Sequence, residues 1–84
     1  MPNPVNNYTQ LKYTVNTSGK VSITVYNAMK QMVKVLVNES KTAGTYSIGW
    51  NTLNSSGSKV PNGLYQVVAV AGNEQFTSTM QVVR

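Results

Sequence analysis

Glu39 and Glu74 are the only acidic side chains among the 84 residues of this chain, which contains neither histidine nor cysteine. Acid–base catalysis, thiol chemistry and metal binding all depend on side chains that are therefore scarce or missing. Both glutamates stand beside turn-rich segments, where side chains are normally exposed to solvent. The composition predicts a protein that is not an enzyme and that binds no metal and no cofactor.

One covalent reaction needs only a single acid. A buried glutamate can promote an isopeptide bond between a lysine and an asparagine of the core, as in some bacterial adhesin domains. The expected exposure of Glu39 and Glu74 argues against this reaction here. The G-x-S-x-G motif of serine hydrolases does not occur in the sequence either.

The chain is basic, with seven Lys and Arg residues against two acids and a formal net charge of +5. Clustered cations would predict nucleic-acid binding, because they displace counterions from phosphate. The cations are instead dispersed, at Lys12, Lys20, Lys30, Lys34, Lys41, Lys59 and Arg84. We therefore expect no nucleic-acid partner, and lysines that keep exposed faces soluble and protect edge strands.

Length and composition indicate one small globular domain. The hydrophobic fraction is 40% and the charged fraction 11%, which is too apolar for a disordered chain. No apolar stretch approaches the ~20 residues of a membrane-spanning helix, so we expect no membrane insertion. Met1 precedes a Pro-Asn-Pro segment, which indicates a piece of a larger polypeptide. We expect residues 1–7 to be a linker remnant without a signal peptide, and residues 8–84 to be the folded domain.

Apolar and polar residues alternate over most of the chain, which is the pattern of half-buried β-strands. In the first such segment, Leu11, Tyr13 and Val15 would share one face. Six strands are predicted, at residues 9–15, 20–27, 31–39, 45–51, 64–71 and 75–83, with a short seventh piece near residues 59–60. Their spacing of roughly 8–12 residues, without helical periodicity, predicts an all-β antiparallel sandwich of about seven strands.

Some segments predict local detail. Residues 31–39 are apolar on both faces, which we interpret as a β-bulge that exchanges the inward-facing residues midway. Trp50 and Tyr46 alternate with small polar residues and, like Tyr65, are expected in the core rather than on a sugar-binding platform. Tyr26 is the tyrosine that we expect to be most exposed.

Two turns are marked by their residue types. Residues 54–58 fit a tight hairpin in which Gly57 supplies a positive φ, and Asn62-Gly63 is a strong turn signal before the next strand. In the last strand, the alternation places Phe76, Met80 and Val82 on one side.

The whole chain resembles the Ig-like β-sandwich modules found at the C-termini of exported bacterial proteins. One branch of these modules is the C-terminal sorting domain of type IX secretion cargo, and a near relative is the Ig-like domain of the flagellar hook-capping scaffold. The motifs that carry the resemblance are, in order, Pro2-Asn3-Pro4, Gly19-Lys20-Val21-Ser22-Ile23-Thr24-Val25-Tyr26-Asn27, Gln31-Met32-Val33, Leu36, Ala43-Gly44, Trp50, Gly57, Val60-Pro61-Asn62-Gly63-Leu64-Tyr65, and Val82-Val83 before Arg84.

The chain also departs from the family in two places. The family usually has a glycine before the Gln of the third strand, where this chain has Lys30. It often has acids after the Trp, where this chain has Asn51, Thr52 and Asn54. Amides alone bind calcium poorly, so the second departure supports the prediction of no metal.

The resemblance implies that a secretion-machinery protein recognises the folded module. The module would act as a sorting or cell-surface anchoring signal of a larger secreted bacterial protein, and would be monomeric in isolation. Two alternatives remain open: an accessory module that binds carbohydrate or protein in a secreted glycanase or adhesin, and a structural domain of a flagellar hook cap. Candidate partner-recognition residues lie in and directly after the hairpin at 54–62 and in the last strand, namely Lys59, Asn62, Gly63, Met80, Val82, Val83 and Arg84.

Overall fold

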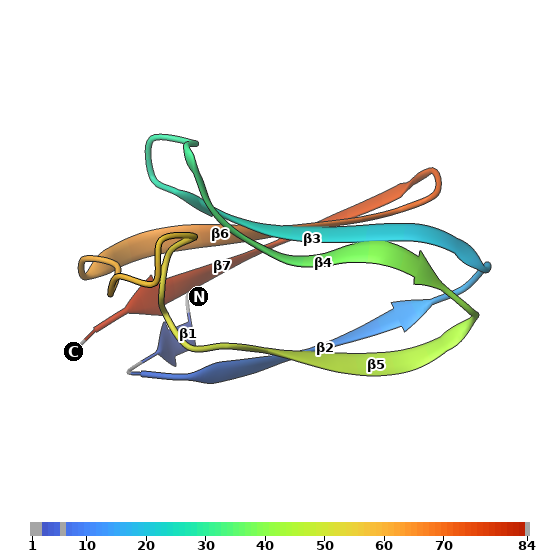
Figure 1. Ribbon diagram of the computed structural model, residues 1–84, viewed down its shortest axis with the longest axis horizontal. Coiled ribbons are helices and arrows are strands. Elements are labelled where there is room, and N and C mark those ends of the chain that lie inside the picture. The colour runs from blue at the N-terminus through green and yellow to red at the C-terminus, as the bar shows by residue number, and fades with distance from the viewer. Residues whose placement is uncertain (1–2, 6, 84) are drawn as a thin grey trace.

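The computed structural model describes residues 3–5 and 7–83, which form a sandwich of two β-sheets (Figure 1). A five-stranded sheet has the order β1-β7-β6-β3-β4, and β2 pairs with β5 in a second sheet. The strands are β1 (Asn3–Val5), β2 (Thr9–Val15), β3 (Gly19–Asn27), β4 (Met32–Lys41), β5 (Gly44–Trp50), β6 (Gly63–Ala71) and β7 (Glu74–Val82). Every pairing is antiparallel except that of β1 with β7. The predicted all-β antiparallel sandwich of about seven strands is confirmed.

The core lies between the two sheets and consists of the inward-facing members of the alternating strands. From the central strand β3 it takes Val21, Ile23 and Val25, which are all buried. Trp50, at the end of β5, is 1% exposed and meets the ring of Tyr65 edge-on at a centroid distance of 5.7 Å. The remaining buried apolar residues are Val15, Val37, Val60, Val67, Met80 and Val82. The expected core positions of Trp50 and Tyr65 are confirmed.

Strand β4 is irregular where the sequence predicted a bulge. Two residues of β4, Leu36 and Val33, have no partner in the register with β3. Ile23 pairs with Val37 and Thr24 with Val35, and further along Val25 pairs with Lys34 and Tyr26 with Met32. Val37 is consequently buried while Val35 is exposed, although the two residues are two positions apart. The bulge therefore exchanges the inward-facing residues midway, as predicted.

Within the predicted linker of residues 1–7, the structure places strand β1 at residues 3–5, and residues 1, 2 and 6 lie outside the described residues. Asn3–Val5 pairs in parallel with β7, in register with residues 80–82. Pro4 is compatible with this pairing because β1 is the edge strand of its sheet, and its outer side takes part in no ladder.

The exposed tyrosine is also not the expected one. Tyr8 is 60% exposed, whereas Tyr26 is half-buried on β3. The ring of Tyr8 lies across Gly49 of β5, where any larger side chain would collide with it. The glycine gives this ring a place on the outside of the two-stranded sheet.

The two-stranded sheet covers only part of the larger one. On the inner face of β7, Met80 and Val82 are buried, but Phe76 is 54% exposed and Ser78 is also exposed. Phe76 was expected to share a side with Met80 and Val82, and it does so at a part of β7 that no strand covers. Among the described residues, no helix has the length and apolar composition needed to cross a membrane.

Candidate partner-contact surface

One end of the sandwich carries a groove of ≈ 700 Å³, which we call the loop-end groove. It is bordered by the β3–β4 turn, by the hairpin at residues 54–58 and by the chain leading into β6. In Figure 1 these segments lie at the end of the molecule where β7 finishes. Its apolar lining includes Met29, Met32 and Leu64, which are 78%, 61% and 48% exposed.

The β3–β4 turn is organised by the side chain of Asn27. Its Oδ1 accepts hydrogen bonds from the backbone N–H groups of Met29 and Gln31, both at 2.9 Å. Its Nδ2 donates to Oε1 of Gln31 at 3.0 Å. Lys30 has a φ of 63°, in the left-handed region. The turn therefore presents Met29 to solvent on a backbone that is held by one asparagine.

The hairpin at residues 54–58 repeats this design. Oδ1 of Asn54 accepts from the backbone N–H groups of Ser56 and Ser58, at 2.9 and 3.0 Å. Gly57 has a φ of 83° and occupies the position that corresponds to Lys30, three residues after the asparagine. The predicted hairpin and the positive φ of Gly57 are confirmed.

The hairpin is attached to β4 at the second irregularity of that strand. Ser55 donates to the carbonyl oxygen of Val33 from its backbone N–H, at 3.0 Å, and from its hydroxyl, at 3.1 Å. This pair of bonds holds two walls of the loop-end groove together. The third wall is held through Tyr65, whose hydroxyl donates to the carbonyl oxygen of Pro61 at 2.6 Å.

This bond of Tyr65 is the tyrosine corner of Ig-like sandwiches, in which a tyrosine hydroxyl binds the backbone a few residues upstream. The corner occurs twice in this chain. Tyr46 donates to the carbonyl oxygen of Thr42 at 2.6 Å, and its hydroxyl lies 3.0 Å from Oγ1 of Thr42. Both tyrosines stand in the same sequence pattern, Gly44-Thr45-Tyr46 and Gly63-Leu64-Tyr65. The tyrosine corner fixes the entry of β5 and of β6.

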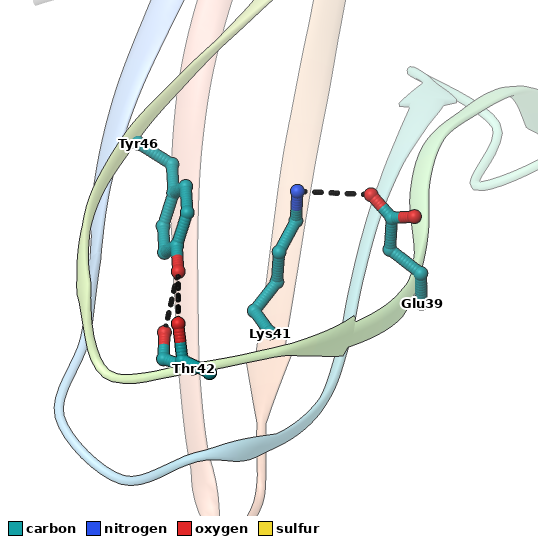
Figure 2. Close-up of polar contacts among 4 residues, drawn as sticks. All are labelled: Glu39, Lys41, Thr42 and Tyr46. Carbon is teal, nitrogen blue, oxygen red and sulfur yellow. Dashed lines mark hydrogen bonds and ion pairs between the residues drawn. The ribbon is translucent and has the colours of Figure 1, made fainter.

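The second corner lies on the β4–β5 hairpin, together with an ion pair (Figure 2). Nζ of Lys41 is 2.9 Å from Oε1 of Glu39 and 4.9 Å from the centroid of the Tyr46 ring. The hydrogen bond with Glu39 raises the pKa of Lys41 above the ordinary lysine value. Tyr46 also stacks on Tyr13 at 5.6 Å, and it is half-buried against the core as expected.

The predicted partner-recognition residues fall into three groups. Lys59, Asn62 and Val83 are exposed and Gly63 is half-buried, and pairing of Gly63 with Val82 brings the start of β6 beside the end of β7. Met80 and Val82 are 3% and 0% exposed, so they are core residues and cannot contact a partner of the folded module. Arg84 lies outside the described residues. Met29, Met32 and Leu64 of the loop-end groove were not predicted, although a methionine in a turn was a usable signal.

Three polar side chains at this end form hydrogen bonds within the fold. Oδ1 of Asn51 accepts from the backbone N–H of Leu53 at 3.3 Å, and Oδ1 of Asn54 caps its hairpin. Thr52, in the same loop, is 1% exposed and donates to the carbonyl oxygen of Asn51 at 2.7 Å. Its burial was not predicted, because the loop is polar. These side chains stabilise the loop by hydrogen bonds to its backbone.

The two glutamates contact different partners. Glu39 is paired with Lys41, and Glu74 accepts a hydrogen bond from Nδ2 of Asn16 at 3.2 Å. Both glutamates are exposed, as expected. An S-x-x-K spacing does occur at Ser56 and Lys59 in the exposed hairpin, but this hairpin is shaped by Asn54 and gives the serine no enclosed surroundings.

A two-layer antiparallel sandwich with a tyrosine corner beside a buried tryptophan defines the class of Ig-like domains. Residues 7–75 match the FlgD Ig-like domain family, and the chain belongs to this family. No curated protein sequence matches it.

Solved structures support the same class. FlgD from P. aeruginosa shares 25% identity with a TM-score of 0.68, over 88% of this chain and 57% of that one. FlgD from Helicobacter pylori shares 20% identity with a TM-score of 0.64, over 90% of this chain and 60% of that one. The chain therefore spans less than two thirds of either FlgD structure.

Two Porphyromonas gingivalis proteins have the same fold over nearly the whole chain. Dimeric latent PorU shares 22% identity, and PorZ, an essential surface component of the type IX secretion system, shares 16%. Both give a TM-score of 0.70 and cover 98% and 99% of this chain, but the matches are 9% and 11% of those proteins.

Proposed function

We propose that the chain is a non-catalytic structural module of a larger exported bacterial protein, which packs against neighbouring protein as a domain of the flagellar hook-cap type. The match of residues 7–75 to the FlgD Ig-like domain family carries this proposal, because it extends from the start of the two-stranded sheet into β7. The 25% identity with FlgD from P. aeruginosa supports it.

The loop-end groove supplies a surface suited to such packing. Met29, Met32 and Leu64 expose apolar surface whose burial against a partner is favourable, and methionine adapts its shape at low cost. Lys30 is exposed in the β3–β4 turn, and Lys59 is exposed directly after the hairpin at residues 54–58. Cations at the rim of an apolar patch favour an acidic partner and increase the rate of association.

Domain exchange tests the proposal. The Ig-like domain of P. aeruginosa FlgD would be replaced by this chain, and motility and hook formation would be measured. We expect assembly to be retained. A triple variant, Met29→Ser with Met32→Ser and Leu64→Ser, should reduce assembly while circular dichroism shows an intact fold. Val35→Ser, at an exposed position outside the groove, is the matched control. Loss of assembly with a folded chimera would contradict the hook-cap role.

A second candidate is a sorting or anchoring module recognised by a type IX secretion-machinery protein. The likeness to PorU and PorZ favours it, because it extends over 98% and 99% of the chain and so beyond residue 75, where the family match ends. This candidate places the module in a secreted or cell-surface protein, and its experiment differs from the first.

The chain would be fused to an inert exported reporter in P. gingivalis, and reporter at the cell surface would be measured. Export that depends on the chain supports the sorting role, whereas a folded fusion retained in the periplasm rejects it. If the fusion is retained in the periplasm while the FlgD chimera is functional, only the hook-cap role remains supported.

A further inference from the structure

We propose that the free edge of β2 accepts an extended segment of a protein partner, whose apolar side chains fill a second groove between β2 and the inner face of β6 and β7. Within the described part of the chain, β2 pairs with β5 along one edge only. The other edge borders this groove, of ≈ 370 Å³, which we call the side groove. The surface lies away from the loop-end groove and does not depend on the proposed function.

The edge of β2 is suited to strand addition. Its seven residues pair with β5 in unbroken register, from Thr9 with Trp50 to Val15 with Gly44, so no bulge interrupts it. Half of the backbone N–H and C=O groups of an edge strand point away from its partner and can pair with another chain. Five consecutive residues of β2, from Leu11 to Val15, border the side groove together with Asn16, so the backbone edge of β2 faces the groove directly.

The walls of the side groove are apolar and continuous with the core. Leu11 and Tyr13 line it from β2, and Val67, Ala69 and Ala71 line it from β6, where two alanines give it depth. Phe76 lies at its rim on β7 and is 54% exposed. This is the part of the larger sheet that the two-stranded sheet leaves uncovered.

The spacing of sheets fits an added strand. A strand hydrogen-bonded to β2 would lie about 4.8 Å from it, in the same layer, and that layer packs about 10 Å from the facing sheet. Alternate side chains of the added strand would then reach Ala69 and Phe76. The occupant is therefore an extended segment with apolar residues at every second position.

The charge of β2 defines the other face of the occupant. Lys12 is exposed and forms no ion pair within residues 7–83, and its neighbour on β5 is Ser47. Opposite charges on adjacent strands stabilise a pair, and like charges destabilise it. The net charge of +5 also favours an acidic partner segment. The partner segment therefore presents an acidic residue on its outward face, beside Lys12.

A capped peptide of the sequence Thr-Val-Glu-Val-Thr-Val-Thr is the probe, and amide NMR of the full chain is the measurement. We expect saturable shifts in β2 and on the inner face of β6 and β7, with new protection of β2 amides from hydrogen exchange. Two further peptides would be N-methylated on alternate residues, one set for each edge of the strand. Only one of the two should lose binding, because only one edge faces β2.

Matched variants separate the two parts of the inference. Lys12→Glu should weaken binding of the glutamate peptide about two- to fivefold, and a peptide with lysine in place of glutamate should recover it. Lys20→Glu makes the same charge change at an exposed position of β3 outside the groove and should have no effect. Phe76→Thr should weaken the binding of both peptides. A dispersed NMR spectrum of this variant, recorded first, shows that the fold is intact.

Several results would overturn the inference. They are the absence of saturable binding, equal binding of both N-methylated peptides, and protection that appears on β7 instead of β2. Self-association of the chain that protects β2 amides without peptide would assign the edge to a second copy instead.

Discussion

Ser55 donates two hydrogen bonds to one acceptor, the carbonyl oxygen of Val33, from its backbone N–H and from its hydroxyl. Val33 is a residue that the pairing of β3 with β4 passes over, because Val25 pairs with Lys34 and Tyr26 with Met32. A bulged residue has no partner in the ladder, so its carbonyl is available to another segment. The bulge of β4 is thus the attachment point of the hairpin.

Removal of the hydroxyl measures this attachment. Ser55→Ala keeps the backbone bond to Val33 and loses the side-chain bond, which should lower the free energy of unfolding by about 0.5–1.5 kcal/mol. Ser56→Ala is the control, because Ser56 is exposed and bonds Asn54 through its backbone N–H. Urea denaturation of both variants is the measurement. Equal stability of the two variants would show that the hydroxyl contributes nothing.

Lys30 occupies a position at which the family usually has glycine, and its φ of 63° explains why glycine is favoured there. A residue with a Cβ is strained in this region by about 1–2 kcal/mol, while glycine is not. Lys30→Gly should therefore stabilise the fold by about 0.5–1 kcal/mol, after the larger entropy of glycine in the unfolded chain is subtracted. Lys30→Ala keeps the strain and loses the charge, so it should bring no gain. Thermal unfolding of both variants decides, and a destabilised glycine variant would contradict the argument.

The two tyrosine corners differ in burial, which predicts different costs of losing the hydroxyl. Tyr65→Phe leaves the carbonyl oxygen of Pro61 without this donor next to the core and should cost about 1–2 kcal/mol. Tyr65 is 5% exposed, whereas Tyr46 is half-buried and its bond lies at the surface. Water can replace the bond that Tyr46→Phe removes, so this variant should cost less than about 1 kcal/mol. Chemical denaturation gives both values, and a reversed order would refute the role of burial.

The ion pair of Lys41 predicts a dependence on alkaline pH. Because its pKa is raised in the folded state, chiefly by the hydrogen bond to Glu39, folding favours the charged ammonium. This stabilisation is complete below the pKa of the unfolded chain and is lost as the pH rises through the folded-state pKa. An NMR titration of Lys41 Nζ should show the raised pKa, and Glu39→Gln should return it toward the ordinary value. An unchanged pKa in this variant would exclude Glu39 as the cause.

Much of the fold could be predicted because strands with one buried face have a period of two. The faces of β2, β3 and β5 follow from alternation alone, and the bulge of β4 was visible as apolar residues on both faces. The positions of Trp50 and Tyr65 followed from the same pattern.

Alternation does not report which strand covers which. It grouped Phe76 with Met80 and Val82, but cannot show that the cover ends between them. The parallel pairing of Asn3–Val5 joins residues at opposite ends of the sequence, and proline argued against a strand there. The loop-end groove likewise depends on two hairpins and the chain leading into β6 meeting in space, so among the candidate partner-recognition residues only Asn62 and Gly63 line it.

The parallel pairing of β1 with β7 has a mechanical consequence. Asn3 aligns with Met80 and Val5 with Val82, so the chain enters β1 at one end of the paired segment and leaves β7 at the other. A tensile load applied through these two strands acts along them and strains all of their cross-links at once, in shear. Strands paired in this way resist extension until the whole segment ruptures, because no cross-link can break before the others are loaded.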